Sequence, residues 1–426
     1  MRHKLHILFF SLLVIFFFLG ISLLNYIADY YNVFSKQFGM DCFSIPYKYM
    51  YIMLKAYKNQ KKDTLFIGAS DTETLFNPER FFYNMYFNRI SIPYSNIKIQ
   101  YIVLKNYIKL HPETKNVYLF LSTNSFIKGN ADDNMKEMKN INYNFDEIYF
   151  LLFSINTTKL SIKKLYENNF NINKYKNTHF LHEKACNENL FFVNKYPTLF
   201  IENGKNTATK NTFINDYKDN IFYLKKIFQL LKNNNINCYI IFTPNHAILQ
   251  SITYLDFDIY EKWKYVKKLC VENLGNHVFD FNIINKYTSV KYKNNFIFAE
   301  FSHPNHVYGL LIFKVLHDNF SDYDNLYIKL NEKDFDKQML KEKKHIEDYI
   351  KKNKDILESY INSKNYNYNY QDNMKQIKIE LNEAPSFIQD EIKLYEYNFR
   401  KINEELSNGK FEMGKFDNTF YTKIDK

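Results

Sequence analysis

The sequence contains very little glycine and arginine. Nine glycines stand in a chain of 426 residues, against a typical share of about 7%. Only four of the 57 basic residues are arginine (Arg2, Arg80, Arg89 and Arg400), so the formal net charge of +11 comes mostly from lysine. Proteins that bind nucleic acid depend on the bidentate arginine fork for phosphates and bases, so this composition argues against nucleic acid as a partner. The lysine-rich, glycine-poor bias is typical of drift toward AT-rich codons.

Cysteine is also scarce and irregularly spaced. The four residues Cys42, Cys186, Cys238 and Cys270 form no C-x-x-C pair, which excludes a zinc knuckle and a disulfide framework. Cys238 lies in an apolar run and Cys270 on an amphipathic stretch, so both are expected to be buried free thiols. The apolar share of 46% excludes wholesale disorder, and no cofactor is predicted.

The N-terminal segment is the one long hydrophobic run. The chain is almost wholly apolar from Leu5 to Ile27, enough at about 1.5 Å per residue to cross a hydrocarbon core of about 30 Å. Arg2 and Lys4 precede the run, which predicts a cytoplasmic N-terminus. A cleaved signal peptide is the alternative, but no small-residue cleavage site follows. We therefore expect residues 1–28 to be a single-pass anchor in the cytoplasmic membrane, with the main domain on its outer face.

The body of the chain alternates between short apolar runs and helical patterns. Such alternation, with runs that are apolar on both sides, predicts an α/β fold with a doubly wound parallel sheet of the three-layer, flavodoxin-like kind. In such sheets the working residues gather at the carboxyl ends of the strands. The expected strands are Thr64–Ile67, Asn116–Leu121, Asn237–Phe242 and His277–Phe281, and the expected helices are Asn96–Leu110, Tyr217–Asn233, Tyr260–Asn273 and Pro304–His317.

Composition also suggests how the chain is divided. We assign residues 29–325 to the α/β domain, with an insertion or lid at about 129–215, where asparagine, lysine and aromatic residues replace the regular pattern. Residues 326–426 are strongly charged and include a helical run at 335–352. This part is expected to be a helical tail, either a solvated appendage or an arm that binds a partner.

The first chemical motif is Phe66-Ile67-Gly68-Ala69-Ser70, a serine directly after a buried strand. A strand-to-helix turn would expose the Ser70 side chain, and Gly68 permits the tight backbone that such a turn needs. The alternative is an ordinary serine N-cap.

The second motif is Glu300-Phe301-Ser302-His303-Pro304-Asn305. A carboxylate three residues before a histidine can hold the imidazole in one tautomer, as the third member of a catalytic triad does. An ordinary helix start at Pro304 is one alternative. A metal site formed by Glu300, His303 and His306 is another, but Pro304 disrupts their common helical face, so no metal is predicted.

Taken together, these motifs resemble the SGNH (GDSL-like) hydrolase superfamily. The resemblance covers Asp29 to Asp322. Within the superfamily, the chain is most similar in character to the membrane-anchored cell-envelope branch, which includes relatives of the alginate O-acetyltransferases and of the D-alanyl-lipoteichoic acid transfer protein. It is carried by four stretches, which read TLFIGASDTETLFNPERF, NVYLFLSTNSF, YIIFTPNH and FAEFSHPNHVYG.

The resemblance implies a Ser-His-Glu triad. Ser70 would be the nucleophile and His303 the general base, with Glu300 in place of the family's usual aspartate. Asn124 and the Ser70 backbone N–H would form the oxyanion hole. The glycine that normally adds a donor has no counterpart here, so the backbone N–H of Ile92 is the candidate for that role.

The expected activity is that of an esterase or O-acyltransferase that modifies a cell-surface polysaccharide or teichoic-type polymer through an acyl-serine intermediate. Its expected partners are this polymer and a membrane-bound acyltransferase. Arg80 and Arg89 are candidates to hold an anionic polymer, with ordinary surface arginines as the alternative. Two other functions stay open: an inactive scaffold that binds the polymer or the acyltransferase, and a structural envelope protein without a site.

Overall fold

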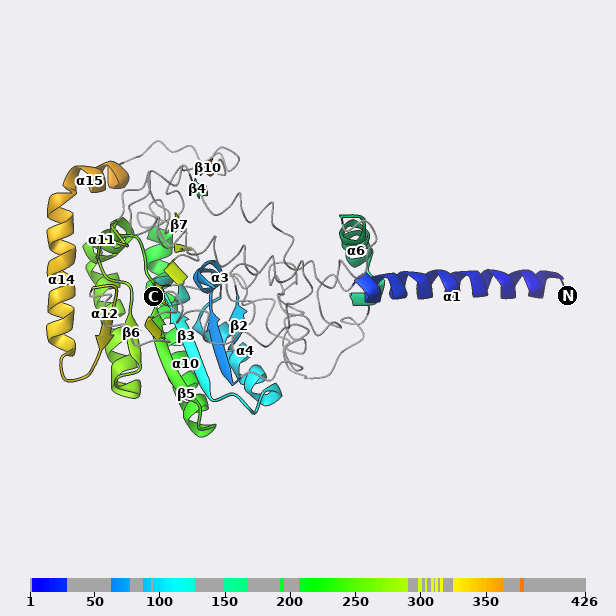
Figure 1. Cartoon of the computed structure of the whole chain (residues 1–426), viewed down its shortest axis with the longest axis horizontal. Coiled ribbons are helices and arrows are strands. Elements are labelled where there is room, and N and C mark those ends of the chain that lie inside the picture. The colour runs from blue at the N-terminus through cyan, green and yellow to red at the C-terminus, as the bar shows by residue number, and fades with distance from the viewer. Residues whose placement is uncertain are drawn as a thin grey trace, which may run out of the picture. The chain divides into compact units, whose positions relative to one another are not determined.

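The computed structural model describes residues 2–28, 63–76, 87–92, 95–126, 149, 151–167, 192–194, 207–289, 298–300, 303–304, 308–309, 311–312, 315–316, 325–362 and 376–378. The chain divides into two compact units, which are described separately (Figure 1). The first consists of Met1–Lys61, Asn106–Pro112 and Asp133–His182, and the second of Lys62–Lys105, Glu113–Asp132 and Glu183–Lys426.

The first unit contains the apolar helix α1 (Arg2–Ala28) and the shorter helix α6 (Ile155–Glu167). Over Lys4–Ala28, α1 is long and apolar enough to cross a membrane, and no other helix in the described part of the chain meets this condition. Its large side chains, such as Phe9 and Phe16, are exposed. The structure thus confirms an N-terminal apolar helix compatible with a membrane anchor or a signal sequence, while its orientation stays a prediction.

The second unit is built on a six-stranded sheet in the order β2-β1-β3-β5-β6-β9. All neighbours pair in parallel except β9, which runs antiparallel to β6. The first five strands follow the 2-1-3-4-5 order of flavodoxin-like doubly wound sheets, which confirms the predicted α/β class. The strands are β1 (Thr64–Gly68), β2 (Phe87–Ser91), β3 (Asn116–Leu121), β5 (Asn237–Phe242), β6 (Val278–Asp280) and β9 (Ile328–Leu330).

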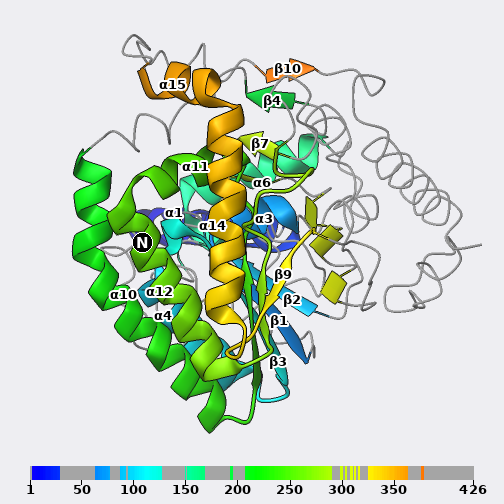
Figure 2. The ribbon, with the colours of Figure 1, turned by 90° about the vertical axis from the view of Figure 1, so that its left-hand side faces the viewer.

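The helices of this unit include the larger part of α4 (Ile97–Leu110), together with α10 (Thr207–Asn233), α11 (Ala247–Leu255) and α12 (Phe257–Leu274). Figure 2 shows α10 and α12 side by side over the sheet, and a ring contact of 5.6 Å between Tyr101 and Tyr223 joins α4 to α10. The three predicted helices of this region are confirmed. However, α10 begins ten residues earlier than expected, inside the predicted insertion.

The predicted boundary between domain and tail at residue 325 is wrong. Residues 328–330 form the edge strand β9 of the sheet, and the next helix, α14 (Phe335–Lys352), packs against α11. A further helix, α15 (Lys354–Asn362), follows. The short strand β10 (Gln376–Lys378) pairs with β4 (Phe192–Asn194). Much of the charged C-terminal region therefore belongs to the α/β unit.

A small hairpin consists of β7 (Phe298–Glu300) and β8 (His303–Pro304). Pro304 is thus a strand residue, and the helix predicted to start there begins later. Residues 308, 309, 311, 312, 315 and 316 are helical, and Tyr308, Leu311, Ile312 and Val315 are buried, which is the spacing of an amphipathic helix. Cys238 and Cys270 are buried free thiols, as predicted.

Candidate active site

Ser70 is the first residue of α3 (Ser70–Leu75), a helix of six residues that starts directly after β1. A helix this short is marginal by itself, so contacts with the rest of the fold must hold it. One such contact is the close approach of α3 to the backbone at Gly68. A Cβ atom there would collide with the Thr72 hydroxyl and the Phe120 side chain. Gly68 therefore lets the first turn of α3 lie directly on the sheet.

Three aromatic rings fix the far end of α3. Phe66 of β1, Phe76 at the helix C-cap and Phe120 of β3 are all fully buried. Their ring centroids lie 5.0 to 5.3 Å apart, in edge-on or tilted contact. Such pairs each add about 0.5–1.5 kcal/mol beyond the burial of their area. The cluster fixes α3 against the two central strands.

The N-terminal turn of α3 is tied to β5 by a buried carboxylate. Asp71 accepts a hydrogen bond from its neighbour Thr72 N–H at 2.9 Å and another from the Thr243 hydroxyl at 2.7 Å. Thr243 follows β5, and its own N–H donates to the Leu121 carbonyl at 2.9 Å. An acidic side chain in the first turn also suits the helix dipole. Neither Asp71 nor Thr243 is recognisable as a site residue from its sequence context alone.

The helical segment around Gly309 is pressed against the same helix. A Cβ atom at Gly309 would overlap the backbone carbonyl group of Leu75. Glycine is therefore required here for close backbone approach. The two glycines inside the predicted motifs, Gly68 and Gly309, thus both contact α3 or its neighbours, one at each end of the helix.

These contacts bring together the two residues expected to do the chemistry. The Ser70 hydroxyl and His303 Nε2 are 2.8 Å apart, although 233 positions separate them in the chain. Both side chains are half-buried. When Ser70 donates this hydrogen bond, Nε2 is the unprotonated nitrogen and the imidazole proton sits on Nδ1. This is the arrangement in which a histidine can remove the serine proton.

Glu300 lies opposite His303 on the neighbouring strand of the hairpin. The two residues are register partners in the β7–β8 pair. The side chain of Glu300 lies outside the described residues, so its predicted role in orienting His303 stays a prediction. Among the residues that the structure describes, no group of three His, Cys, Asp or Glu side chains could hold a metal ion.

The predicted oxyanion donors have different outcomes. Asn124 lies in the 3-10 helix η3 (Thr123–Phe126), directly after β3, but its side chain is outside the described part. The turn is fixed by Ser125, whose hydroxyl accepts from Ser122 N–H at 3.1 Å, and by Asn220, whose amide donates to the Phe126 carbonyl at 3.0 Å. The structure corrects the prediction that the Ile92 backbone N–H is an oxyanion donor. This N–H donates to the Gly68 carbonyl at 3.0 Å, where it continues the pairing between β1 and β2, so it is already used within the sheet.

The structure describes only one of the two arginines predicted to bind substrate. Arg80 lies outside the described residues. Arg89 belongs to β2 and is 7% exposed, so the interpretation as an ordinary surface arginine is wrong for it. Its Nη1 donates to the Phe76 carbonyl at 2.7 Å, which adds another contact at the C-terminal end of α3. The predicted role of Arg89 in substrate binding stays a prediction.

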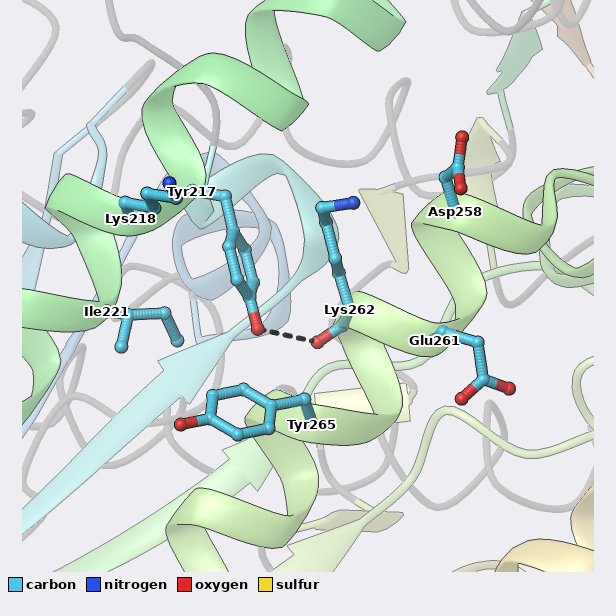
Figure 3. A pocket seen from close by; sticks show the side chains of 7 residues that line it. All are labelled: Tyr217, Lys218, Ile221, Asp258, Glu261, Lys262 and Tyr265. Atoms are coloured by element: carbon cyan, nitrogen blue, oxygen red, sulfur yellow. Dashed lines mark hydrogen bonds between the residues drawn. The ribbon is translucent and has the colours of Figure 1, made fainter.

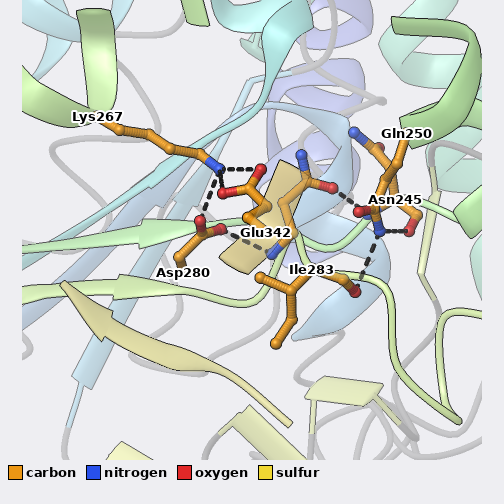
Figure 4. A network of polar contacts seen from close by, with 7 residues as sticks. Asn245, Gln250, Lys267, Asp280, Ile283 and Glu342 are labelled. Carbon is orange, nitrogen blue, oxygen red and sulfur yellow. Dashed lines mark hydrogen bonds and ion pairs between the residues drawn. The ribbon is translucent and has the colours of Figure 1, made fainter. Parts of the chain in front are cut away.

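A second polar constellation, which the sequence did not reveal, lies beside β6. Lys267 of α12 forms an ion pair of 2.6 Å with Asp280 of β6 and donates to both carboxylate oxygens of Glu342 of α14 at 2.9 Å (Figure 4). All three side chains are at most 5% exposed. We call these residues the buried charge cluster. It fastens α14, from the predicted tail, to the sheet.

The environment of this cluster shifts two pKa values. Burial lowers the pKa of Lys267, but the adjacent carboxylates of Asp280 and Glu342 outweigh it, and the net shift is upward. Burial raises the pKa of Glu342 to about 7, with the positive charge of Lys267 opposing that shift and the negative charge of Asp280 adding to it. With two carboxylates facing one ammonium, a proton on Glu342 leaves the cluster neutral.

Hydrogen bonds extend from the cluster to the strand ends. Asp280 accepts from the backbone N–H of Asn282 at 2.9 Å, and the Asn282 side chain accepts from the N–H of Asn245 at 3.0 Å. Gln250 donates to the carbonyl of Asn245 at 2.7 Å and to that of Ile283 at 3.3 Å (Figure 4). This network fixes the loops that follow β5 and β6.

A shallow groove of about 470 Å³ lies between α10 and α12 (Figure 3). The Tyr217 hydroxyl donates to the Lys262 carbonyl at 3.2 Å. Burial, aided by the neighbouring Tyr265, raises the pKa of Tyr217. Neither Ser70 nor His303 lines this groove; its lining is Tyr217, Lys218, Ile221, Asp258, Glu261, Lys262 and Tyr265.

Comparison with known proteins adds no relative: no family model, no curated protein and no solved structure matches the chain.

Proposed function

We propose that the protein is a membrane-anchored serine esterase or O-acyltransferase that works through an acyl-serine intermediate. The observation that carries this proposal is the 2.8 Å contact between the Ser70 hydroxyl and His303 Nε2. The pair lies where the first strand of an α/β sheet ends and the strand order reverses, which is where ligands of such sheets bind. The resemblance to the SGNH hydrolases, carried by the residues around Ser70 and His303, supports the same reaction class.

In the first half-reaction, the Ser70 oxygen attacks an acyl carbonyl while His303 Nε2 takes the hydroxyl proton. The carbon–oxygen bond to the leaving alcohol then breaks, and His303 passes the proton to that alcohol. In the second half, an acceptor hydroxyl or water gives its proton to His303 and attacks the acyl-serine. The acyl group leaves Ser70, whose oxygen regains the proton from His303.

The negative charge that develops on the carbonyl oxygen needs hydrogen-bond donors. We assign this role to the Ser70 backbone N–H and to Asn124. The first N–H groups of a helix have no partner within the helix, and Ser70 is the first residue of α3. Glu300 is assigned to the imidazolium that forms on His303, in the manner of the third triad member.

The proposed substrate is an acylated cell-surface polysaccharide or teichoic-type polymer on the outer face of a bacterial cytoplasmic membrane. Two observations support it: the apolar helix α1, compatible with a membrane anchor, and the resemblance to the cell-envelope branch of the superfamily. A membrane-bound acyltransferase that supplies the acyl group is the proposed partner for the transfer reaction.

Labelling of the full-length protein by a fluorophosphonate probe tests the proposal, because such probes react with activated serines. We expect wild-type protein to be labelled and Ser70→Ala to be unlabelled. His303→Ala should be labelled more slowly by a factor on the order of a thousand or more, since the general base is lost. Ser289→Ala and His345→Ala are matched controls, because Ser289 bonds the Asn285 carbonyl and His345 is exposed on α14. Both should be labelled like wild type.

Two outcomes would contradict the proposal. Labelling of Ser70→Ala at the wild-type rate would mean that another residue reacts. Folded wild-type protein that resists the probe would instead favour a scaffold that binds the polymer or the acyltransferase without chemistry. One observation already favours this second function: the N–H of Ile92, the stand-in for the family's missing glycine, is bonded to Gly68.

A further inference from the structure

Helix α6 is docked on the C-terminal end of α1 through a buried asparagine (Figure 1). The Asn25 amide of α1 donates to the Leu152 carbonyl at 2.8 Å and to the Thr158 hydroxyl at 3.0 Å. Asn25 is 1% exposed and Ala28 is fully buried, whereas most of the apolar side chains of α1 before them are exposed. This polar contact lies three residues from the end of α1.

The surface of α6 divides into two stripes. Thr157, Ser161 and Leu165, four residues apart, are buried. At about 100° per residue, Ile155, Ile162 and Tyr166 form another stripe roughly 120° away. These three are 72%, 50% and 72% exposed. The second stripe of α6 is therefore both apolar and exposed.

Lysines border the exposed stripe. Lys159 and Lys163 are exposed and lie about 40° and 80° beyond its centre on the helix circumference. An apolar stripe with lysines along its edge is the pattern of a helix that lies in a membrane interface, where lysine side chains reach the headgroups.

The residues before α6 extend the contact along α1. The Phe153 ring lies 6.4 Å from that of Phe18, and Tyr149, which is 51% exposed, stacks on Phe153 at 6.4 Å. Phe18 is ten residues, or about 15 Å, before the end of α1. If α1 crosses a membrane, Phe153 lies at the depth of the acyl chains, and α6 lies where α1 leaves them.

We propose that α6 is a second membrane contact that lies in the headgroup layer of the leaflet from which the C-terminal end of α1 emerges, with Phe153 and the stacked Tyr149 ring reaching the acyl chains beside α1. The partner is a phospholipid surface with anionic headgroups. Ile155, Ile162 and Tyr166 enter the boundary of the acyl chains, and Lys159 and Lys163 contact the lipid phosphates. Continuity with the apolar surface of α1 favours lipid over a soluble partner. This inference is independent of the chemistry at Ser70.

Depth-dependent fluorescence quenching tests the proposal. The full-length protein is reconstituted in vesicles of phosphatidylcholine and phosphatidylglycerol, with or without bromine on the acyl chains. Three variants each add one tryptophan at an exposed position: Ile162→Trp on the stripe, Asn156→Trp about 100° away on the same helix, and Leu340→Trp on α14. The single native tryptophan, Trp263, is 3% exposed and gives a constant background.

We expect Ile162→Trp to show blue-shifted emission and several-fold more quenching by brominated lipid than Asn156→Trp, and Leu340→Trp supplies an exposed tryptophan of the other unit for comparison. Emission from Ile162→Trp at the wavelength of water-exposed tryptophan, or equal quenching at positions 162 and 156, would overturn the proposal. So would shielding of Ile162→Trp from aqueous quencher in native membranes but not in these pure lipid vesicles, since that result assigns the stripe to a membrane protein.

Discussion

The Ser70–His303 pair and the buried charge cluster are two polar constellations of one sheet, and they differ in almost every physical respect. Ser70 and His303 are half-buried and neutral when the hydrogen bond forms in the direction that catalysis needs. Lys267 and Asp280 form an ion pair, Glu342 shares the Lys267 ammonium, and all three side chains are nearly inaccessible to solvent. The Ser70–His303 pair is accessible to a substrate, whereas the buried charge cluster is not accessible to molecules from solution.

The difference concerns what burial does to a polar group. A buried ion pair loses hydration that its Coulomb attraction only partly replaces, so its removal leaves an uncompensated charge and threatens the fold. A serine and a histidine at the surface of a sheet lose little hydration, so their removal should affect chemistry far more than stability. The following predictions test this contrast.

Lys267→Ala should have the largest effect on stability. It leaves two buried carboxylates without their cation, and the free energy of unfolding should fall by about 3–5 kcal/mol. The adjacent exposed residue supplies the matched control: Lys268→Ala should stay within about 0.5 kcal/mol of wild type. Chemical denaturation measures both. Similar small losses for the two variants would mean that the cluster contributes nothing to stability.

Thr243→Val should have an intermediate effect that reaches the site. The change keeps the shape of the side chain but removes the donor to the buried Asp71 carboxylate, at a cost of about 1–3 kcal/mol. Because Asp71 fixes the first turn of α3, probe labelling of Ser70 should slow as well. Thr253→Val, which removes a hydroxyl bond to the Leu249 carbonyl within α11, is the control and should leave labelling unchanged. Labelling at the wild-type rate in Thr243→Val would exclude a positioning role for this contact.

The smallest effect should be a pH dependence of stability that comes from Glu342. In the folded protein its pKa is raised to about 7, against about 4.3 for a free glutamate. Between these values the folded state holds a proton that the unfolded state has lost, so the free energy of unfolding should decrease as the pH rises. Glu342→Gln, compared with wild type in denaturant titrations at several pH values, should flatten this slope. An unchanged slope would assign the dependence to other groups.

The elements that the sequence predicted well are those whose buried residues are apolar. The runs at 64–67, 116–121 and 237–242 contain few polar side chains, and each became a strand of the sheet. The strand β2 was missed because Asn88, Arg89 and Ser91 are buried in it. Arg89 finds its partner in the Phe76 carbonyl, a contact that no local pattern reveals.

The same limit explains what was missed around the site. The motif around Ser70 and the motif around His303 could each be recognised, and the structure brings their side chains into contact. The pairing of Asp71 with Thr243 depends on the order of the strands, which is set only when the sheet forms. Glu342 lies in a segment whose charged composition suggested a solvated tail, yet its carboxylate is buried, where the Lys267 ammonium pairs with it.

The buried Asn25 restricts how α1 can move relative to the rest of its unit. An apolar helix that only tethers a protein to a membrane can turn about its own axis and slide without loss. The Asn25 amide bonds the Leu152 carbonyl, just before α6, and the Thr158 hydroxyl of α6, and these two contacts fix both the rotation and the height of α1 relative to that segment. The apolar helix is then an integral component of a folded unit. An unrelated apolar helix of equal length would leave the Leu152 carbonyl and the Thr158 hydroxyl without the donor that Asn25 supplies.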